Sequence, residues 1–234
     1  MGDALFAASL VWLLYIALEP HVRRRWPNSL ISWTRLLTGH VRDPIVGRDL
    51  LLGIVAGIFW VLCDRATFLA PKWMGKTPSP PVSQLDLIQL GGGIRTVVAD
   101  LLLNVTIFVF IALVFFFAFF LLRLITKREW LAAAIVAALI ALPAAFGPHA
   151  VVNTIGAVFV NSLALLILIR FGLLAMIVTL TLQNALEAFP LTAHIFAWYG
   201  EPTIFMFALL LAISIFAFYT STAGKPLFGS ISLD

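Results

Sequence analysis

Seven polar side chains fall within or at the ends of strongly apolar stretches, and they are the residues best placed to bind a solute. Polar groups are costly to bury in lipid, so those within membrane segments often bind protons, ions or substrates. A transporter would arrange such groups around a cavity near the bilayer midplane. The seven candidates are Asp100, Asn104, Asn153, Asn161, Gln183, Asn184 and Glu187.

Two pairs among these candidates have helical spacings. Asp100 and Asn104 are four residues apart in one apolar stretch, and Asn153 and Asn161 are eight apart in another. Residues at these spacings lie on roughly one face of an α-helix. Each pair is therefore expected on one helix face, where it either contributes to a polar path or bonds to a neighbouring helix.

The other three candidates form a cluster. Gln183, Asn184 and Glu187 fall near the end of one apolar stretch. Glu187, like Asp100, is close to a predicted helix end, where an acid can reach the membrane interface. Bonding between helices or contact with the interface is thus the simpler interpretation of these residues, and a transport path is the alternative.

The four histidines offer little metal or cofactor chemistry. His21 and His40 lie in a basic stretch, and no two histidines have a metal-ligand spacing. His149 and His194 lie near the ends of apolar stretches, where a lone histidine can ligate a pigment or haem axially. Hydrogen bonding to headgroups or backbone is the simpler role for both. We expect no metal and no cofactor.

Two glycine-containing motifs resemble nucleotide-binding sequences without their context. The "MGKT" at Met74–Thr77 matches the end of a phosphate-binding loop, but Ala70 stands where the pattern requires its first Gly. The triple Gly at 91–93 is better explained as a flexible entry to the next apolar segment. The sequence also lacks a hydrolytic constellation, because Asp100 has no second Asp within its span. We predict that the chain is not an enzyme.

Composition predicts that these residues lie in a polytopic membrane protein. The 234 residues are 62% hydrophobic and 11% charged, against about 25% charged in soluble domains. The mean hydropathy is +1.06 and the pI is near 9.6. Because the basic residues flank apolar stretches, topology and anionic lipid explain them better than nucleic acid does. We expect one integral membrane domain over residues 1–234.

An all-α bundle of about seven spans is the predicted fold. Several apolar stretches are about as long as the ~20 residues that a helix needs to cross a bilayer. If Arg170–Gly172 does not end a helix, the count falls to six. The first two segments are short, so they either extend into their flanks or cross where the bilayer is thin. The predicted segments are 4–19, 49–63, 97–122, 130–146, 150–169, 172–189 and 203–220.

A basic interfacial segment, 20–48, follows the first predicted span. Pro27 suits the first turn of a helix and Gly39 suits the position just past its end. Between them, Leu30, Trp33 and Leu37 recur at helical spacing, which predicts a short amphipathic helix at the membrane surface. The residues expected to contact lipid headgroups are Arg23, Arg24, Arg25, Trp26, Trp33, Arg35, Arg42 and Arg48.

The distribution of positive charge predicts the orientation. With the N-terminus outside, eleven of the fifteen Lys and Arg residues fall in cytoplasmic loops. The other four lie in the long Pro- and Gly-rich loop 64–96, and long loops obey the positive-inside rule weakly. We therefore expect a bacterial inner-membrane protein with its N-terminus outside and its C-terminus in the cytoplasm.

Part of the sequence resembles a known membrane region. The stretch "YIALEPHVRRRWPNSLISWTRLLTGHVRDPIVGRDLLLG", Tyr15 to Gly53, is similar to the membrane-embedded C-terminal region of bacterial, acidobacterial-type, transmembrane serine/threonine protein kinases. The similarity continues to "YTSTAGKPLFG", Tyr219 to Gly229. Its specific elements are ALEP-x-x-RRRWP and RDP-x-VGRD. Kinase-domain motifs do not occur in this chain, so the resemblance implies association with signalling rather than phosphoryl transfer.

Three functions fit these observations. The first is a non-enzymatic membrane module that anchors, senses or assembles with a protein partner, held by anionic lipid. The second is a transporter or permease subunit with a polar intramembrane path. The third is an accessory subunit of a larger membrane complex that binds lipid or pigment.

Overall fold

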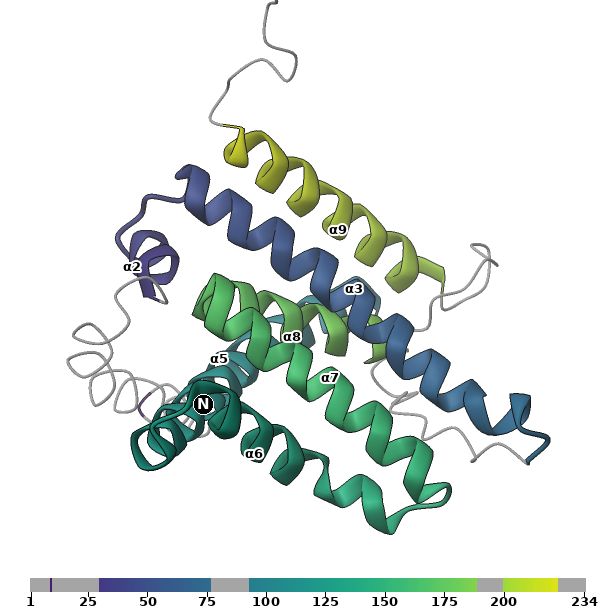
Figure 1. The fold of residues 1–234 in the computed structure, drawn as a ribbon. Helices are drawn as coiled ribbons and strands as arrows, with labels where there is room; N and C mark the ends of the chain where they lie inside the picture. Colours follow the sequence, from purple (N-terminus) through teal and green to yellow (C-terminus); the bar gives the residue numbers. More distant parts are fainter. Residues whose placement is uncertain (1–8, 10–29, 77–92, 189–199, 223–234) are drawn as a thin grey trace, which may run out of the picture.

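The computed structural model describes residues 9, 30–76, 93–188 and 200–222, and this part of the chain is helical (Figure 1). A short helix precedes two long ones, and four more helices and one 3₁₀ turn complete the bundle. The elements are α2 (Ile31–Leu37), α3 (Pro44–Trp73), α5 (Gly93–Thr126), α6 (Glu129–Ala141), the 3₁₀ helix η2 (Leu142–Phe146), α7 (Ala150–Phe171), α8 (Leu173–Ala188) and α9 (Gly200–Ser221).

Five of the described segments are long and apolar enough to cross a membrane, as the all-α prediction requires. They are Pro44–Trp73, Val97–Thr126, Glu129–Phe146, Ala150–Phe171 and Thr203–Ser221. Helix α8 is apolar but has 16 residues, fewer than the ~20 that a span needs. The predicted first segment, 4–19, lies outside the described residues. The chain therefore has the helices of a polytopic membrane protein.

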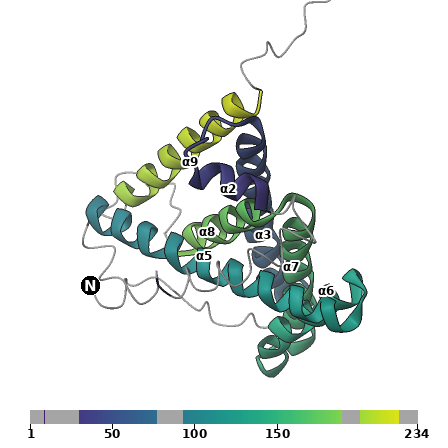
Figure 2. The same ribbon diagram turned by 90° about the vertical axis from the view of Figure 1, so that its left-hand side faces the viewer.

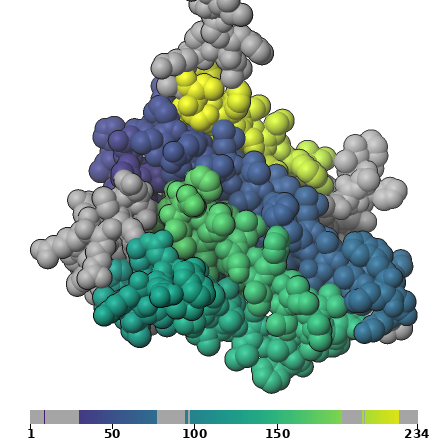
Figure 3. All heavy atoms as spheres, viewed as in Figure 1, coloured from purple at the N-terminus to yellow at the C-terminus, as the bar shows by residue number. Residues whose placement is uncertain are grey.

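Helix α8 lies at the centre of the bundle. It packs against α3, α5 and α7, while α9 lies along α3 (Figures 1 and 2). The space-filling view shows α9 beside the first half of α3, with α7 and α8 between α3 and α6 (Figure 3). Leu173, Met176 and Thr179 of α8 are fully buried. A helix enclosed in this way packs mainly against other helices, so it need not match the bilayer thickness.

Small residues of α3 allow its close contacts. A Cβ atom on Gly47 would lie 2.5 Å from the backbone N of Ser221 on α9, and one on Gly53 would lie 2.8 Å from the carbonyl O of Ala175 on α8. At the second contact, the Thr179 hydroxyl donates to Ala175 O at 2.8 Å and is 3.3 Å from Gly53 O. Small residues and hydroxyl bonds of this kind are typical of helix contacts in membranes.

The bounds of α3 correct the sequence prediction at both ends. The predicted segment was 49–63, whereas the helix runs from Pro44 to Trp73. Asp43 caps its N-terminus, since its side chain accepts a hydrogen bond from the Ile45 N–H at 2.9 Å. The short second segment thus extends into both flanks, which was one of the two predicted alternatives. Residues 64–73 of the predicted loop 64–96 are helical, and residues 77–92 lie outside the described part.

The other helices lie close to their predicted positions. Helix α5 is longer than the predicted 97–122 by four residues at each end. The segment predicted at 130–146 is an α-helix followed by a 3₁₀ turn that begins at Leu142, beside Pro143. The break at Gly172 is confirmed, because this residue has φ +93° and its N–H bonds to Ile167 O and Leu168 O. Helices α7 and α8 are therefore separate.

Candidate functional site

A pair of carboxyl groups joins α3 to α8. Asp64 lies in the second half of α3 and Glu187 lies at the end of α8, and their side chains hydrogen-bond to one another. Both residues are partly buried. An ionised carboxylate has only acceptors, so a hydrogen bond between two carboxyl groups requires a proton on one of them. The contact between Asp64 and Glu187 is therefore one that forms when the two carboxyl groups hold one proton between them.

Two neutral donors complete the site. The Gln183 Nε2 group, one turn before Glu187 on α8, donates to Glu187 Oε2 at 2.6 Å. The indole N–H of Trp60, one turn before Asp64 on α3, donates to the Asp64 carboxyl. Trp60 is buried, with 8% of its surface exposed. Each acid is thus held by a donor from its own helix and bonds across the contact to the other acid.

The charge balance of the site depends on that proton. Among the described residues, Arg65 is the one other charged side chain that acts on both carboxyls. Arg65 is exposed. With one proton on the pair, a single negative charge faces one positive charge. Loss of the proton would place two negative charges across the α3–α8 contact, and like charges at this distance repel.

Sequence analysis identified half of this site. Glu187 and Gln183 were among the candidates, but Asp64 was assigned to the loop 64–96, just past the predicted segment 49–63. The carboxyl of Asp64 is instead satisfied by Trp60 and Glu187, so the helix continues through it. The available signal was the i, i+4 spacing of Trp60 and Asp64, which puts an indole donor beside the acid.

The predicted asparagine pair has local roles. Asn153 Nδ2 donates to Pro148 O at 2.6 Å, next to the start of α7. Asn161 is buried, and its Nδ2 donates to Ala157 O of its own helix at 2.7 Å. These bonds satisfy the backbone of α7 and do not bring the two amides to the carboxyl pair.

The remaining polar candidates are partly buried on two helices. Asp100 and Asn104 lie one turn apart on α5, as their spacing predicted, and Asn184 follows Gln183 on α8. The structure gives none of the three a hydrogen bond to the carboxyl pair. The cluster that it assembles is therefore Asp64, Glu187, Gln183 and Trp60, with Arg65 beside it.

The basic segment is described from Leu30 onward. Arg35 pairs with Asp43, and Arg48 donates to the buried Asp49 at 2.9 Å. Arg42 is exposed. The predicted lipid contacts Arg23, Arg24, Arg25 and Trp26 lie outside the described residues.

A short helix, α2, lies where the sequence predicted the amphipathic helix, and it packs on the bundle. It contacts α3 and α8. Trp33, expected at the headgroups, instead packs against the main hydrophobic cluster. Its indole nitrogen is buried without a hydrogen-bond partner among the described residues. Residues on the inner face of α2 thus contribute to the bundle's interior.

One of the two histidine candidates falls in the described part of the chain. His149 is the N-cap residue of α7, with φ +55°, and His194 lies outside the described residues. No group of three or more metal-ligating side chains gathers in the described part of the chain. Comparison of the sequence and structure with family models, curated proteins and solved structures finds no match.

Proposed function

We propose that this chain is a non-enzymatic integral membrane module that senses proton availability and passes the change to a protein partner. The observation that carries the proposal is the hydrogen-bonded pair of Asp64 and Glu187, which links α3 to the central helix α8. Intramembrane ionisable groups mark functional sites more often than structural ones. A bond that exists only while a proton is present makes the helix contact responsive to that proton.

The packing of α8 suggests how loss of the proton would affect the other helices. Helix α8 touches α3, α5 and α7, so repulsion at its C-terminal end acts on three neighbours. Packed helices move between discrete arrangements rather than deforming continuously. In this proposal the protonated pair holds α8 against α3, and deprotonation releases the end of α8 that carries Gln183 and Glu187.

The sequence resemblance supports a signalling context for the module. A membrane region similar to that of bacterial transmembrane kinases would serve a cytoplasmic partner, and the arginines of segment 20–48 would rest on anionic lipid of the inner leaflet. In this proposal the protein lies in the bacterial inner membrane, with the N-terminus outside and the C-terminus in the cytoplasm.

Hydrogen exchange of the full chain in lipid nanodiscs tests the proposal. After correction for the intrinsic pH dependence of exchange, amides at 183–188 of the wild type should lose protection as the pH is raised. In Asp64→Asn and Glu187→Gln the amide donates without a titratable proton, so protection should stay constant. Glu201→Gln, which changes an exposed acid in the first turn of α9, should behave as the wild type. Identical pH profiles in all four proteins would refute proton sensing at this contact.

A transport function is the second candidate, because a carboxyl pair that holds a proton can also carry one. Asn153 and Asn161 of α7 donate hydrogen bonds to nearby backbone carbonyls, so they do not extend the carboxyl site. Transport predicts a proton flux across vesicles that contain the purified chain and that Glu187→Gln abolishes. Sensing predicts no such flux.

A further inference from the structure

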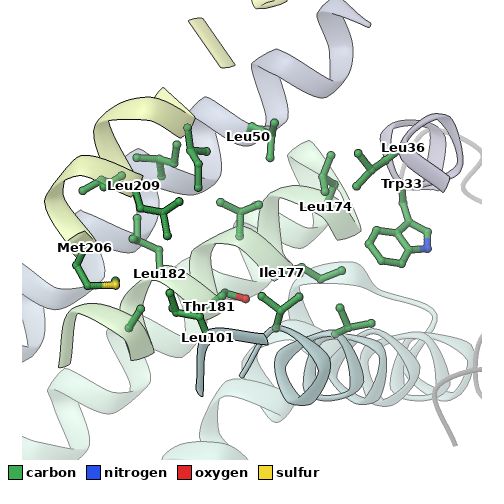
Figure 4. A pocket seen from close by; sticks show the side chains of 17 residues that line it. Trp33, Leu36, Leu50, Leu101, Leu174, Ile177, Thr181, Leu182, Met206 and Leu209 are labelled. Carbon is green, nitrogen blue, oxygen red and sulfur yellow. The ribbon is translucent and has the colours of Figure 1, made fainter. Parts of the chain in front are cut away.

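The bundle contains an elongated apolar cavity separate from the carboxyl pair. Its volume is about 440 Å³, and helices α2, α3, α5, α8 and α9 contribute to its wall. Of its seventeen lining residues, only Thr181 and Trp33 carry a side-chain oxygen or nitrogen. In Figure 4, Trp33 and Leu36 lie at one end of the cavity, and Met206 and Leu209 lie toward the other.

Such a cavity needs an apolar occupant. Protein interiors are close-packed, and wall atoms without neighbours lose their dispersion contacts. Water is a poor occupant because a buried water requires two to four polar partners. The Thr181 hydroxyl oxygen is buried without a hydrogen-bond partner among the described residues, and a single hydroxyl cannot hold a column of water. The volume falls within the ~300–1,000 Å³ of small-molecule sites.

The cavity's length matches one leaflet of a bilayer. Its wall extends along α8 from Leu174 to Ala185, which at 1.5 Å per residue is about 16 Å. The hydrocarbon core of a bilayer is ~30 Å thick, so the acyl chains of one leaflet occupy about 15 Å. A single acyl chain therefore fits the long axis.

The cavity also opens where lipid can enter. Helices α5 and α9 meet near their N-terminal ends and diverge, and α8 lies between them (Figure 2). Val105 on α5 and Ile213 on α9 line the cavity and are 42% and 39% exposed. Both helices are candidate spans. The opening between them therefore faces hydrocarbon, and an acyl chain can pass through it laterally.

Charge distinguishes the two ends of the cavity. Arg35 precedes the lining residue Leu36, and Arg48 lies two residues before the lining residue Leu50. With the exposed Arg42, they outnumber the two acids of this segment, Asp43, which pairs with Arg35, and Asp49, which pairs with Arg48. At the opposite end, Ala185 lies two residues before Glu187. We propose that the cavity binds one acyl chain of an anionic phospholipid, with its headgroup at the α2 end. The site is independent of the proposed proton sensing.

Lipid retention measured by native mass spectrometry tests this site. The full chain is delipidated in detergent and re-exposed to dioleoyl phosphatidylglycerol or, at the same concentration, to dioleoyl phosphatidylcholine. The wild type should retain one phosphatidylglycerol. Val105→Trp narrows the opening and should lower that retention at least about ten-fold, equivalent to ~1.4 kcal/mol. Val114→Trp, at a 40% exposed position of α5 outside the cavity wall, should retain lipid as the wild type does.

Ile213→Trp repeats the test from the opposite wall if Val105→Trp fails to fold. Undiminished retention in the folded cavity variant would overturn the proposal. So would a wild type that retains no phospholipid, as expected if another segment of the chain fills the cavity. Equal retention of the two lipids would overturn the headgroup assignment. None of these outcomes depends on protection of residues 183–188 against exchange, so the two proposals fail separately.

Discussion

At the scale of single residues, most polar side chains of the described helices bond within their own helix, and few reach a neighbouring helix. Thr179 and Thr181 are two residues apart on α8, and they differ in whether the side-chain hydroxyl has a hydrogen-bond partner. The Thr179 hydroxyl is buried at the contact with α3, where it lies 3.3 Å from Gly53 O of α3 and also bonds to Ala175 O of its own helix. The Thr181 hydroxyl oxygen is also buried, but it has no hydrogen-bond partner in the described part of the chain and lines the apolar cavity.

This contrast gives a matched pair of substitutions. Thr179→Val should lower the free energy of unfolding by about 1 kcal/mol, in line with interhelical hydrogen bonds in membranes. Thr181→Val replaces an unpaired hydroxyl with a methyl of similar volume and should be neutral or slightly stabilising. Unfolding of both variants in mixed dodecyl sulfate micelles measures the difference. Equal losses would show that the Thr179 hydroxyl does not stabilise the α3–α8 contact.

At the scale of elements, close approach of α3 to α9 is built on Gly47. Replacing a helical glycine by alanine ordinarily favours the helix by about 1 kcal/mol. Here the new Cβ would meet backbone atoms of α9, Ser221 N at 2.5 Å and Ala217 O at 2.7 Å. Backbone cannot rotate away as a side chain can, so the helices must separate. Overpacking of this kind costs ~1–3 kcal/mol.

Gly47→Ala should therefore destabilise the protein despite its gain in helix propensity. Gly147→Ala serves as the control, because the nearest atom to its added Cβ is Ala144 O at 3.9 Å and its φ is −91°. The control should change the unfolding free energy by no more than about 0.5 kcal/mol. Thermal unfolding in detergent compares the two variants. A Gly47→Ala protein as stable as the control would mean that α3 and α9 are not in contact in solution.

Helices were easier to predict from the sequence than the contacts between them. Long apolar stretches revealed α5, α7 and α9, and Gly172 revealed the break between α7 and α8. The predicted second segment ended at residue 63, before Asp64, whereas α3 continues to Trp73 because the acid has a partner on another helix. That partner, Glu187, belongs to another helix, and one sequence carries no signal of their pairing. The packing of Trp33 against the main hydrophobic cluster was not predicted either, because it also depends on contacts with other helices.

At the scale of the whole molecule, an apolar helix bundle encloses the short helix α8. This helix carries Glu187, one of the two acids of the carboxyl pair. Five long helices present hydrocarbon-like surfaces, while α8 is surrounded by its neighbours. Because Asp64 and Glu187 are partly buried, water screens the charges of this pair less than it screens fully exposed groups. We propose that Asp64 and Glu187 share a proton at neutral pH.

Infrared difference spectroscopy of the reconstituted chain tests that claim most directly. At neutral pH the wild type should show a protonated carboxyl C=O band that disappears when the medium is made alkaline. The band should be missing from the Asp64→Asn/Glu187→Gln double variant and present in Glu201→Gln. A wild type without a protonated carboxyl at neutral pH, or a double variant with a band of unchanged amplitude, would contradict the shared proton.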